Sequence, residues 1–151
     1  LMIIEDEPFL IEYNVRMGDP ECQAILPKLK TDLVEVIESC LNNKLETLKI
    51  DWYQEYTICI VLCSKGYPDR YKNNSEINNL DKIDLKENEF IFHAGTISDK
   101  SRIFSNGGRV LNFVIRSKDL AFARNRAIEL INKLNWSNGF FRKDIGFKVI
   151  N

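Results

Sequence analysis

Histidine is almost absent from this chain: His93 is the only one, and none of the four cysteines forms a C-x-x-C pair. A structural zinc site is therefore not expected, because such sites need Cys and His ligands at short spacings. The chain also lacks an apolar run of about 20 residues, the length that spans a bilayer. It has no basic excess, since its formal net charge is −1. We therefore expect neither a membrane segment nor a nucleic-acid partner.

The composition is that of an ordinary globular protein, with 151 residues, 44% of them hydrophobic and 28% charged. This length fits one medium domain, or one small domain with part of another. Cys59 and Cys63 would share one face of a strand over Tyr56–Ser64, which favours buried thiols in a reducing compartment over disulfides. We thus expect a cytoplasmic protein. The chain opens on the apolar run Leu1–Ile4, followed by acidic residues where a signal peptide would be basic. We expect it to be a fragment of a longer protein.

Hydrophobic spacing predicts an alternation of strands and helices, with a domain boundary near Leu45–Asp51. A first hairpin would join two strands through the acidic turn at residues 5–8. Pro20 would open a short helix, and Thr31 would cap a second helix whose apolar stripe includes Leu33, Ile37 and Leu41. A turn is expected at Ser98–Lys100. The predicted strands are Leu1–Ile4, Phe9–Arg16, Tyr56–Ser64, Glu89–Thr96 and a broken Arg102–Ile115, and the clearest helix is Asp119–Leu134.

The most informative pattern is Glu12-x-Asn14-x-Arg16, because alternate residues of a strand point to the same side. One carboxylate, one amide oxygen and one guanidinium on a single wall suit a magnesium ion and the phosphate oxygens that it bridges. The alternative is an exposed strand face with ordinary polar residues. Asp19 and Glu21, in the turn that follows, add two carboxylates, and repulsion between so many acids favours a bound cation.

Two glycine-containing segments are ambiguous between an anion-binding loop and a simple turn. In Ser64–Pro68, Lys65 and Gly66 end a buried strand. In Asn106–Arg109, two glycines precede Arg109, which would pair with a phosphate or with a neighbouring acid. His93, alone on a strand, is interpreted as a hydrogen-bonded structural residue.

Five segments in order resemble the phosphoribosylamine–glycine ligase family of the ATP-grasp superfamily. Ile11–Gln23 (IEYNVRMGDPECQ) resembles the family's metal-binding strand and the turn after it. The others are Ser64–Pro68, Phe92–Thr96, Ser105–Leu111 and Phe141–Gly146. The resemblance implies an α+β fold. Residues 1–47 would end an ATP-grasp core, and residues 48–151 would form a small C-terminal β-sheet or barrel-like domain with packed helices.

The resemblance also implies a reaction and a set of roles. Enzymes of this family use ATP to join glycine to 5-phosphoribosylamine through a glycyl phosphate, giving glycinamide ribonucleotide in purine synthesis. Glu12 and Asn14 would hold Mg²⁺ or Mn²⁺ with the ATP phosphates, and Leu1 would contact the adenine. Catalytic roles would fall to the side chains of the strand and turn, Arg16, Asp19 and Glu21, and phosphate contacts to Lys65, Gly66 and Arg109.

The same resemblance implies that the N-terminal part of the enzyme, which carries the rest of the ATP site, is missing from this chain. We therefore expect the chain alone to be inactive. Two alternatives stay open: a sister ATP-grasp ligase with another acid substrate, and a non-catalytic α+β binding module.

Overall fold

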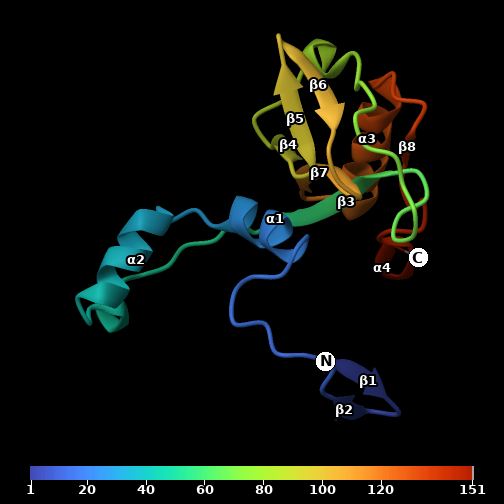
Figure 1. Ribbon diagram of the computed structural model, residues 1–151. Coiled ribbons are helices and arrows are strands. Elements are labelled where there is room, and N and C mark those ends of the chain that lie inside the picture. The colour runs from blue at the N-terminus through green and yellow to red at the C-terminus, as the bar shows by residue number, and fades with distance from the viewer. Residues whose placement is uncertain (151) are drawn as a thin grey trace.

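The computed structural model describes residues 1–150, which form a compact body and an extended N-terminal arm (Figure 1). We call residues 1–52 the arm and residues 53–150 the body. The arm contains β1 (Met2–Ile4), β2 (Glu7–Phe9), α1 (Glu21–Ile25), η1 (Leu26–Lys28), α2 (Leu33–Leu41) and η2 (Leu45–Thr47). The body contains β3 (Tyr56–Ser64), η3 (Leu80–Lys82), β4 (Glu89–His93), β5 (Thr96–Asp99), β6 (Arg102–Ser105), β7 (Arg109–Ser117), α3 (Leu120–Lys133), β8 (Gly139–Phe140) and α4 (Phe147–Ile150).

The body is built on a four-stranded antiparallel sheet in the order β4-β7-β3-β8. The central strands β3 and β7 are rich in β-branched and apolar residues, which suit a pleated surface covered on both sides. Ile60 pairs with Phe113, and the register shifts between Leu62 and Cys63. The strand predicted over Tyr56–Ser64 is confirmed at both ends, and the α+β fold class is confirmed with it.

Helix α3 covers one face of this sheet and closes the core. Ala123, Ala127 and Leu130 follow one another at helical spacing and are fully buried, against sheet residues that include Ile60 and Phe113. Asp119 caps the helix, since its carboxylate accepts a hydrogen bond from the backbone N–H of Phe122 at 3.0 Å. The helix predicted over Asp119–Leu134 is thus confirmed, with those two residues as its caps.

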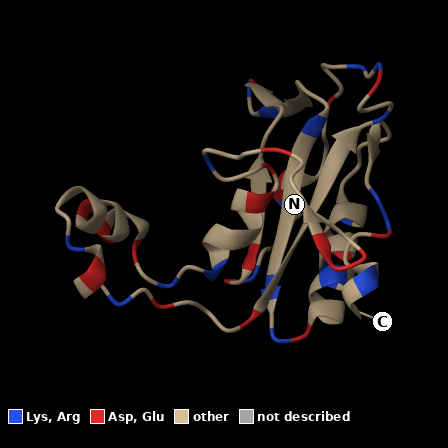
Figure 2. Cartoon of the chain, turned by 90° about the horizontal axis from the view of Figure 1, so that it is seen from below, with Lys and Arg blue, Asp and Glu red and all other residues tan. Residues whose placement is uncertain are grey.

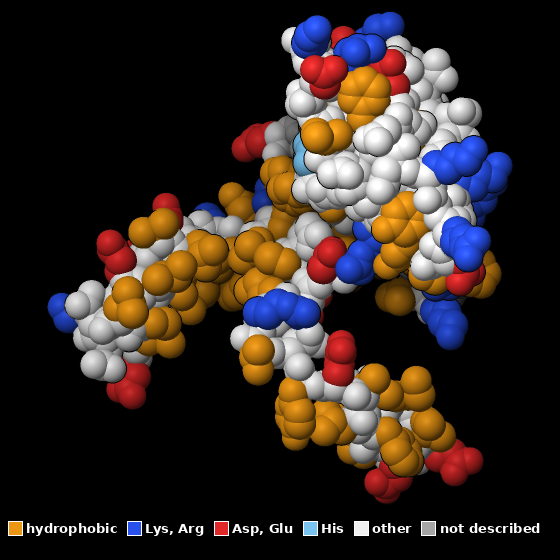
Figure 3. Space-filling view, in the orientation of Figure 1, with side chains coloured by type: hydrophobic (Ala, Val, Ile, Leu, Met, Phe, Trp, Pro, Cys, Tyr) orange, Lys and Arg blue, Asp and Glu red, His pale blue; other side chains and the backbone are white. Residues whose placement is uncertain are grey.

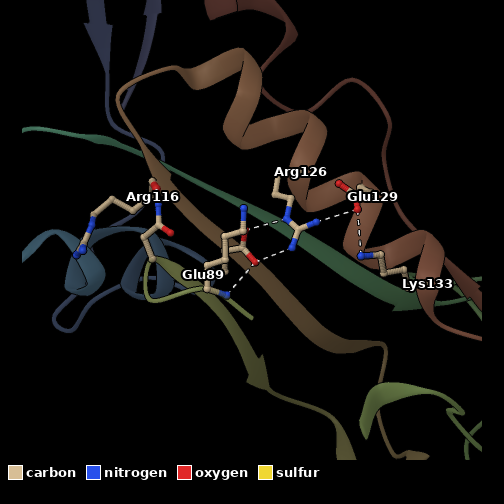
Figure 4. Close-up of polar contacts among 7 residues, drawn as sticks. Glu89, Arg116, Arg126, Glu129 and Lys133 are labelled. Carbon is tan, nitrogen blue, oxygen red and sulfur yellow. Dashed lines mark hydrogen bonds and ion pairs between the residues drawn. The ribbon is translucent and has the colours of Figure 1, made fainter. Parts of the chain in front are cut away.

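A buried ion pair joins α3 to the edge strand β4 (Figure 4). Arg126 donates through Nε to Glu89 Oε1 at 2.8 Å and through Nη2 to Oε2 at 3.0 Å. Burial alone raises the pKa of the Glu89 carboxyl, but the hydrogen bonds from Arg126 and from the Lys86 backbone outweigh it. The pKa of Glu89 therefore lies below its ordinary value, and the carboxylate stays charged inside the body.

The arm extends away from the body and shows its apolar side chains to solvent (Figures 1 and 3). No residue of β1, β2, α1 or α2 is buried. Acidic and basic residues are intermingled along the chain, and neither sign gathers in one part of it (Figure 2). Among residues 1–150, no helix has the length and apolar character needed to cross a membrane.

Several local predictions are wrong. The strand predicted over Glu89–Thr96 ends at His93, and Thr96 begins the next strand, β5. The second strand ends at Phe9, not Arg16, because the backbone after Phe9 has no neighbouring strand among residues 1–150 with which to form a ladder. Pro20 precedes α1 as its N-cap residue. Asp32 caps α2 in place of Thr31, whose hydroxyl instead accepts from the Asp51 N–H at 2.7 Å. Ser98 and Asp99 belong to β5, so the turn predicted at Ser98–Lys100 starts later, at Lys100.

Candidate functional site

Three side chains predicted to share a face do so. We call Glu12, Asn14 and Arg16 the polar row. Asn14 Nδ2 donates to Glu12 Oε1 at 3.1 Å, and Arg16 Nη1 donates to Asn14 Oδ1 at 2.6 Å. The chain here is not part of a sheet and bends at Val15 and Arg16, so the two hydrogen bonds between these side chains keep them on one side. On the opposite side Val15 is 99% exposed.

The polar row forms one wall of an open cavity of about 390 Å³. The turn after it supplies further lining, with Gly18, Asp19, Pro20 and Glu21, and β7 supplies Arg109. The structure therefore brings together six of the site residues expected from the sequence: Glu12, Asn14, Arg16, Asp19, Glu21 and Arg109.

The carboxylates of the turn are paired with protein groups. Glu21 Oε2 accepts from the Gly18 N–H at 3.0 Å, and a Cβ on Gly18 would lie 2.5 Å from that oxygen, so a larger residue there would displace the Glu21 carboxylate. Asp19 accepts from Gln23 Nε2 at 2.8 Å and pairs with Arg109 Nη2 at 3.1 Å. Within residues 1–150 there is no group of three or more His, Cys, Asp or Glu side chains arranged to hold a metal ion. The acidic turn thus adds nothing to the metal prediction, which depends on Glu12 and Asn14.

The glycine-containing motifs of the body pack against one another. Ser64 is fully buried, and its N–H and hydroxyl donate to the carbonyls of Gly108 and Gly107 at 2.7 and 2.8 Å. A Cβ on Gly95 would lie 2.8 Å from Gly107 Cα, and one on Gly108 would lie 2.0 Å from the Tyr67 ring. These glycines therefore permit close contact between three loops. His93 Nδ1 lies 2.9 Å from Thr96 Oγ1, in line with a structural role.

Three expected residues do not line this cavity. Leu1 precedes the hairpin of β1 and β2 and is 81% exposed. Lys65 is held by its backbone N–H, which donates to the Asn138 carbonyl at 2.8 Å. Gly66 has a φ of +100°, and a Cβ there would meet the Arg70 carbonyl oxygen at 2.2 Å, so its glycine is required by the turn itself.

A second cavity, of about 400 Å³, shares Arg109 and Pro20 with the first. Its floor is the face of β3 opposite α3, where Cys59, Val61 and Cys63 lie at alternate positions, as their even spacing predicts. Burial raises the pKa of the Cys59 thiol to about 12, and the charge of Asp19 acts in the same direction. Burial also raises the pKa of Cys63, against an opposing effect of Arg109. Both thiols are therefore protonated at neutral pH and are poor nucleophiles.

The sequence analysis missed the contact that joins the polar row to the body. Arg109 Nη1 donates to the Asp19 carbonyl at 2.9 Å, in addition to its ion pair with the Asp19 carboxylate. At the other end of β7, Arg116 Nη1 donates to the Pro27 carbonyl at 2.6 Å, and its guanidinium lies 3.6 Å from the centre of the Tyr53 ring. The sequence pointed to this contact only through Arg109, which follows two glycines and was expected to pair with a phosphate or with a neighbouring acid.

The body is an α+β domain with an antiparallel sheet, and an open cavity lined by carboxylate and amide oxygens and by arginines lies beside it. The family model "Phosphoribosylglycinamide synthetase, C domain" matches residues 57–148. The chain therefore belongs to the phosphoribosylglycinamide synthetase C-domain family.

Named relatives agree with this assignment. Phosphoribosylamine–glycine ligase of Brucella melitensis is 37% identical over 99% of this chain and 35% of its own length. The ligase of Fusobacterium nucleatum is 41% identical over 97% of this chain and 34% of its own length. The trifunctional purine biosynthetic protein adenosine-3 of Gallus gallus is 40% identical over 99% of this chain and 15% of its own length. The chain thus spans about a third of the length of the ligases.

A solved structure shows the same fold. The crystal structure of phosphoribosylamine–glycine ligase from Thermotoga maritima matches 96% of this chain and 35% of that protein, with a TM-score of 0.71 and 29% sequence identity.

Proposed function

We propose that this chain is the C-terminal part of a phosphoribosylamine–glycine ligase. The reaction would join glycine to 5-phosphoribosylamine at the expense of ATP, through a glycyl phosphate, and release glycinamide ribonucleotide, ADP and phosphate. The family match over residues 57–148 and the names of the relatives support it. The structural observation that carries the proposal is the polar row, which presents oxygen ligands and a guanidinium on one wall of an open cavity.

The polar row fits a magnesium or manganese ion by the chemistry of its ligands. Glu12 offers a carboxylate and Asn14 an amide oxygen, and hard cations of this kind bind through one or two such groups together with substrate phosphates. When bound, the ion would neutralise charge on the phosphates of ATP during transfer. Arg16 already donates to Asn14 Oδ1, so it both orients the amide and places a positive charge beside it.

The remaining residues receive roles according to where they lie. Asp19 and Glu21 line the cavity beside the polar row, and we assign them to orienting the amine substrate. Arg109 lines the same cavity and is the candidate for contact with a phosphate. Lys65 and Gly66 line neither of the two cavities that Arg109 lines, and Leu1 lies outside the site. The binding roles proposed for these three residues therefore depend on contacts with the N-terminal part of the enzyme.

The division of the chain follows the same proposal. Residues 1–47 would complete an ATP-grasp core, and residues 48–151 would be the C-terminal domain, within which the matched residues 57–148 fall. The exposed apolar side of the extended chain, with Tyr13 83% and Val15 99% exposed, supports a second wall supplied by the N-terminal part of the same enzyme. All four cysteines are free, which fits a reducing compartment, and we assign the protein to the cytoplasm.

The decisive experiment is Glu12→Gln in the full-length protein, with ATP-dependent formation of glycinamide ribonucleotide as the measurement. Loss of one carboxylate ligand should lower turnover by about 100-fold or more. Glu7→Gln, an exposed change on β2, is the matched control and should leave turnover unchanged.

Other outcomes would contradict the proposal. A wild-type protein that uses ATP but accepts another acid in place of glycine would be a sister ligase. A full-length protein that shows no ligase turnover, either as wild type or as Glu12→Gln, would be a binding module. The 151-residue chain alone should show no ligase activity, and detectable product from it would refute the assignment of half the ATP site to missing chain.

A further inference from the structure

We propose that Arg109 is a positioning residue, which fixes the polar row in place by holding Asp19. The inference rests on the proposed function, and it gives the body a part in metal binding although the metal ligands lie in the arm. Arg109 is the first residue of β7, and Asp19 lies in the turn that follows the polar row.

The contact is two-fold and joins distant parts of the chain. Arg109 Nη2 pairs with Asp19 Oδ2 at 3.1 Å, and Nη1 donates to the Asp19 carbonyl at 2.9 Å. When a planar guanidinium contacts both the side chain and the backbone of one residue, it fixes the orientation of that residue as well as its distance. Within residues 1–150, no other side-chain hydrogen bond or ion pair joins residues 1–19 to the body.

Asp19 connects the Arg109 contact to the residues before and after it in the turn. Its carboxylate also accepts from Gln23 in α1, and the neighbouring Gly18 N–H is held by Glu21. Gly18 in turn follows Met17, whose carbonyl accepts from Arg16 Nη1 at 3.2 Å. The covalent backbone of Met17, Gly18 and Asp19 therefore connects the contact with Arg109 to the hydrogen bond between Met17 and Arg16 of the polar row.

The backbone of Arg109 is itself firmly held. Its carbonyl accepts from the Gly95 N–H at 2.9 Å. In the preceding loop, a Cβ on Gly108 would lie 2.0 Å from the Tyr67 ring, and one on Gly107 would lie 3.1 Å from Gly95 Cα, so the loop is closely packed. The motifs that resemble the family's signature thus build the base from which Arg109 extends.

A second arginine of β7 keeps the arm from pivoting about this contact. Arg116 donates to the Pro27 carbonyl and lies over the Tyr53 ring, at the far end of the segment formed by α1 and η1. Two attachment points determine both the position and the direction of that segment, where one would determine position alone.

The test compares Arg109→Met, Asp19→Asn and the double variant in the full-length protein. The affinity for Mn²⁺ is measured by electron paramagnetic resonance, and amide hydrogen exchange is measured over residues 10–22. Arg109→Met should weaken Mn²⁺ binding by about 10-fold or more, the usual range when a group that orients metal ligands is lost. It should also speed exchange over residues 10–22. The double variant should be no worse than the worse single variant, because both remove one contact.

Two further variants serve as controls. Arg102→Ala removes an arginine of β6 that pairs with Asp99 and Glu76, away from the arm, and should change neither measurement. Arg109→Lys keeps the charge without the fork, and should restore part of the Mn²⁺ affinity. If Arg109→Met fails to fold, Arg109→Lys carries the same test with a smaller expected loss.

Three results would decide against the inference or separate it from the proposed function. Unchanged Mn²⁺ affinity and unchanged exchange in Arg109→Met would overturn the positioning role, and a raised KM for 5-phosphoribosylamine in that variant would leave Arg109 with the phosphate contact alone. Additive losses in the double variant would also overturn it. A full-length protein without ligase activity would refute the proposed function, whereas the exchange data would still decide whether Arg109 holds the arm.

Discussion

The arm and the body bury their apolar side chains to opposite extents. In the body, Phe113 and Leu130 are fully buried, whereas in the arm Leu41 is 78% exposed and Val15 is 99% exposed. Both parts have strongly patterned sequences, so the difference lies in the availability of a partner surface. The body folds by its own contacts, and the arm carries a pattern suited to contacts beyond residues 1–150. Exposed apolar surface on this scale is typical of contact faces.

The polar groups differ in the same way. The body pairs its charges internally, as with Glu89 and Arg126, and leaves few polar atoms unmatched. The arm displays Glu12, Asn14 and Arg16 in an open cavity. The well-packed body and the arm that carries the polar row are therefore different parts of the chain, and Arg109 joins the polar row's turn to the body.

The largest expected effect is in the core of the body. Phe113→Ala should lower the free energy of unfolding by about 3–5 kcal/mol, because it leaves a cavity where a fully buried ring stood. Urea denaturation followed by circular dichroism measures it. Phe147→Ala in α4, where the ring is 57% exposed, is the control. Equal losses of unfolding free energy in the two variants would contradict the expected difference between buried and exposed aromatic residues.

The buried ion pair should give the next largest effect. Arg126→Met leaves the Glu89 carboxylate buried without its main partner, and should cost about 3 kcal/mol of unfolding free energy. Arg142→Met removes an exposed arginine that pairs with Asp144, and should cost much less, because water screens an exposed pair. Similar costs for the two would show that burial does not decide the strength of these pairs.

The same pair makes stability depend on pH in a defined direction. The pKa of Glu89 is lowered in the folded protein, so the unfolded chain takes up the proton first as the pH falls. Its contribution is fully present above the ordinary carboxyl pKa of 4.5 and is lost as the pH falls through the folded value. The difference in melting temperature between wild type and Glu89→Gln should shrink as the pH falls below 4.5. A difference that grew on acidification would contradict this sign.

The smallest effect should be in the arm, and its size should depend on the length of the protein. Ile37→Gln on α2, a position 50% exposed, should change the stability of the 151-residue chain by less than about 0.5 kcal/mol. In the full-length protein the same change should cost about 1–3 kcal/mol, because the amide would be buried. Glu35→Gln on the same helix is the control for both. Equal, small effects of Ile37→Gln in both proteins would show that α2 has no partner.

Prediction from the sequence succeeded where an element's partners lie within the chain. The bounds of β3 and α3 follow from periodic patterns that are satisfied inside the body, so local pattern and final packing agree. The strand predicted over Phe9–Arg16 failed for the opposite reason, because alternation describes side chains and a strand also needs a neighbour for its backbone. Thr31 and Asp32 are both good caps, and only the contact of Thr31 with Asp51 decides between them.

The candidate site divides in the same manner. Glu12, Asn14 and Arg16 were placed on one face by spacing, and the structure confirms that they share it. The partner of Arg109 was out of reach, because Asp19 lies 90 residues away and nothing in local spacing links them. The glycines near Arg109 were interpreted as possible anion contacts, and their packing against other loops depends on the same long-range topology.

The contacts of Arg109 and Arg116 in β7 also limit the number of residues that the chain can have between Asp19 and Pro27. The two arginines are seven positions apart, so at about 3.3 Å per residue the strand separates them by roughly 23 Å. The stretch from Asp19 to Pro27 is mostly helical and spans about 12 Å at roughly 1.5 Å per residue, so the long side chains of the two arginines cover the remaining distance to its two ends. Insertions and deletions should therefore be rare between residues 19 and 27 when natural sequences are compared.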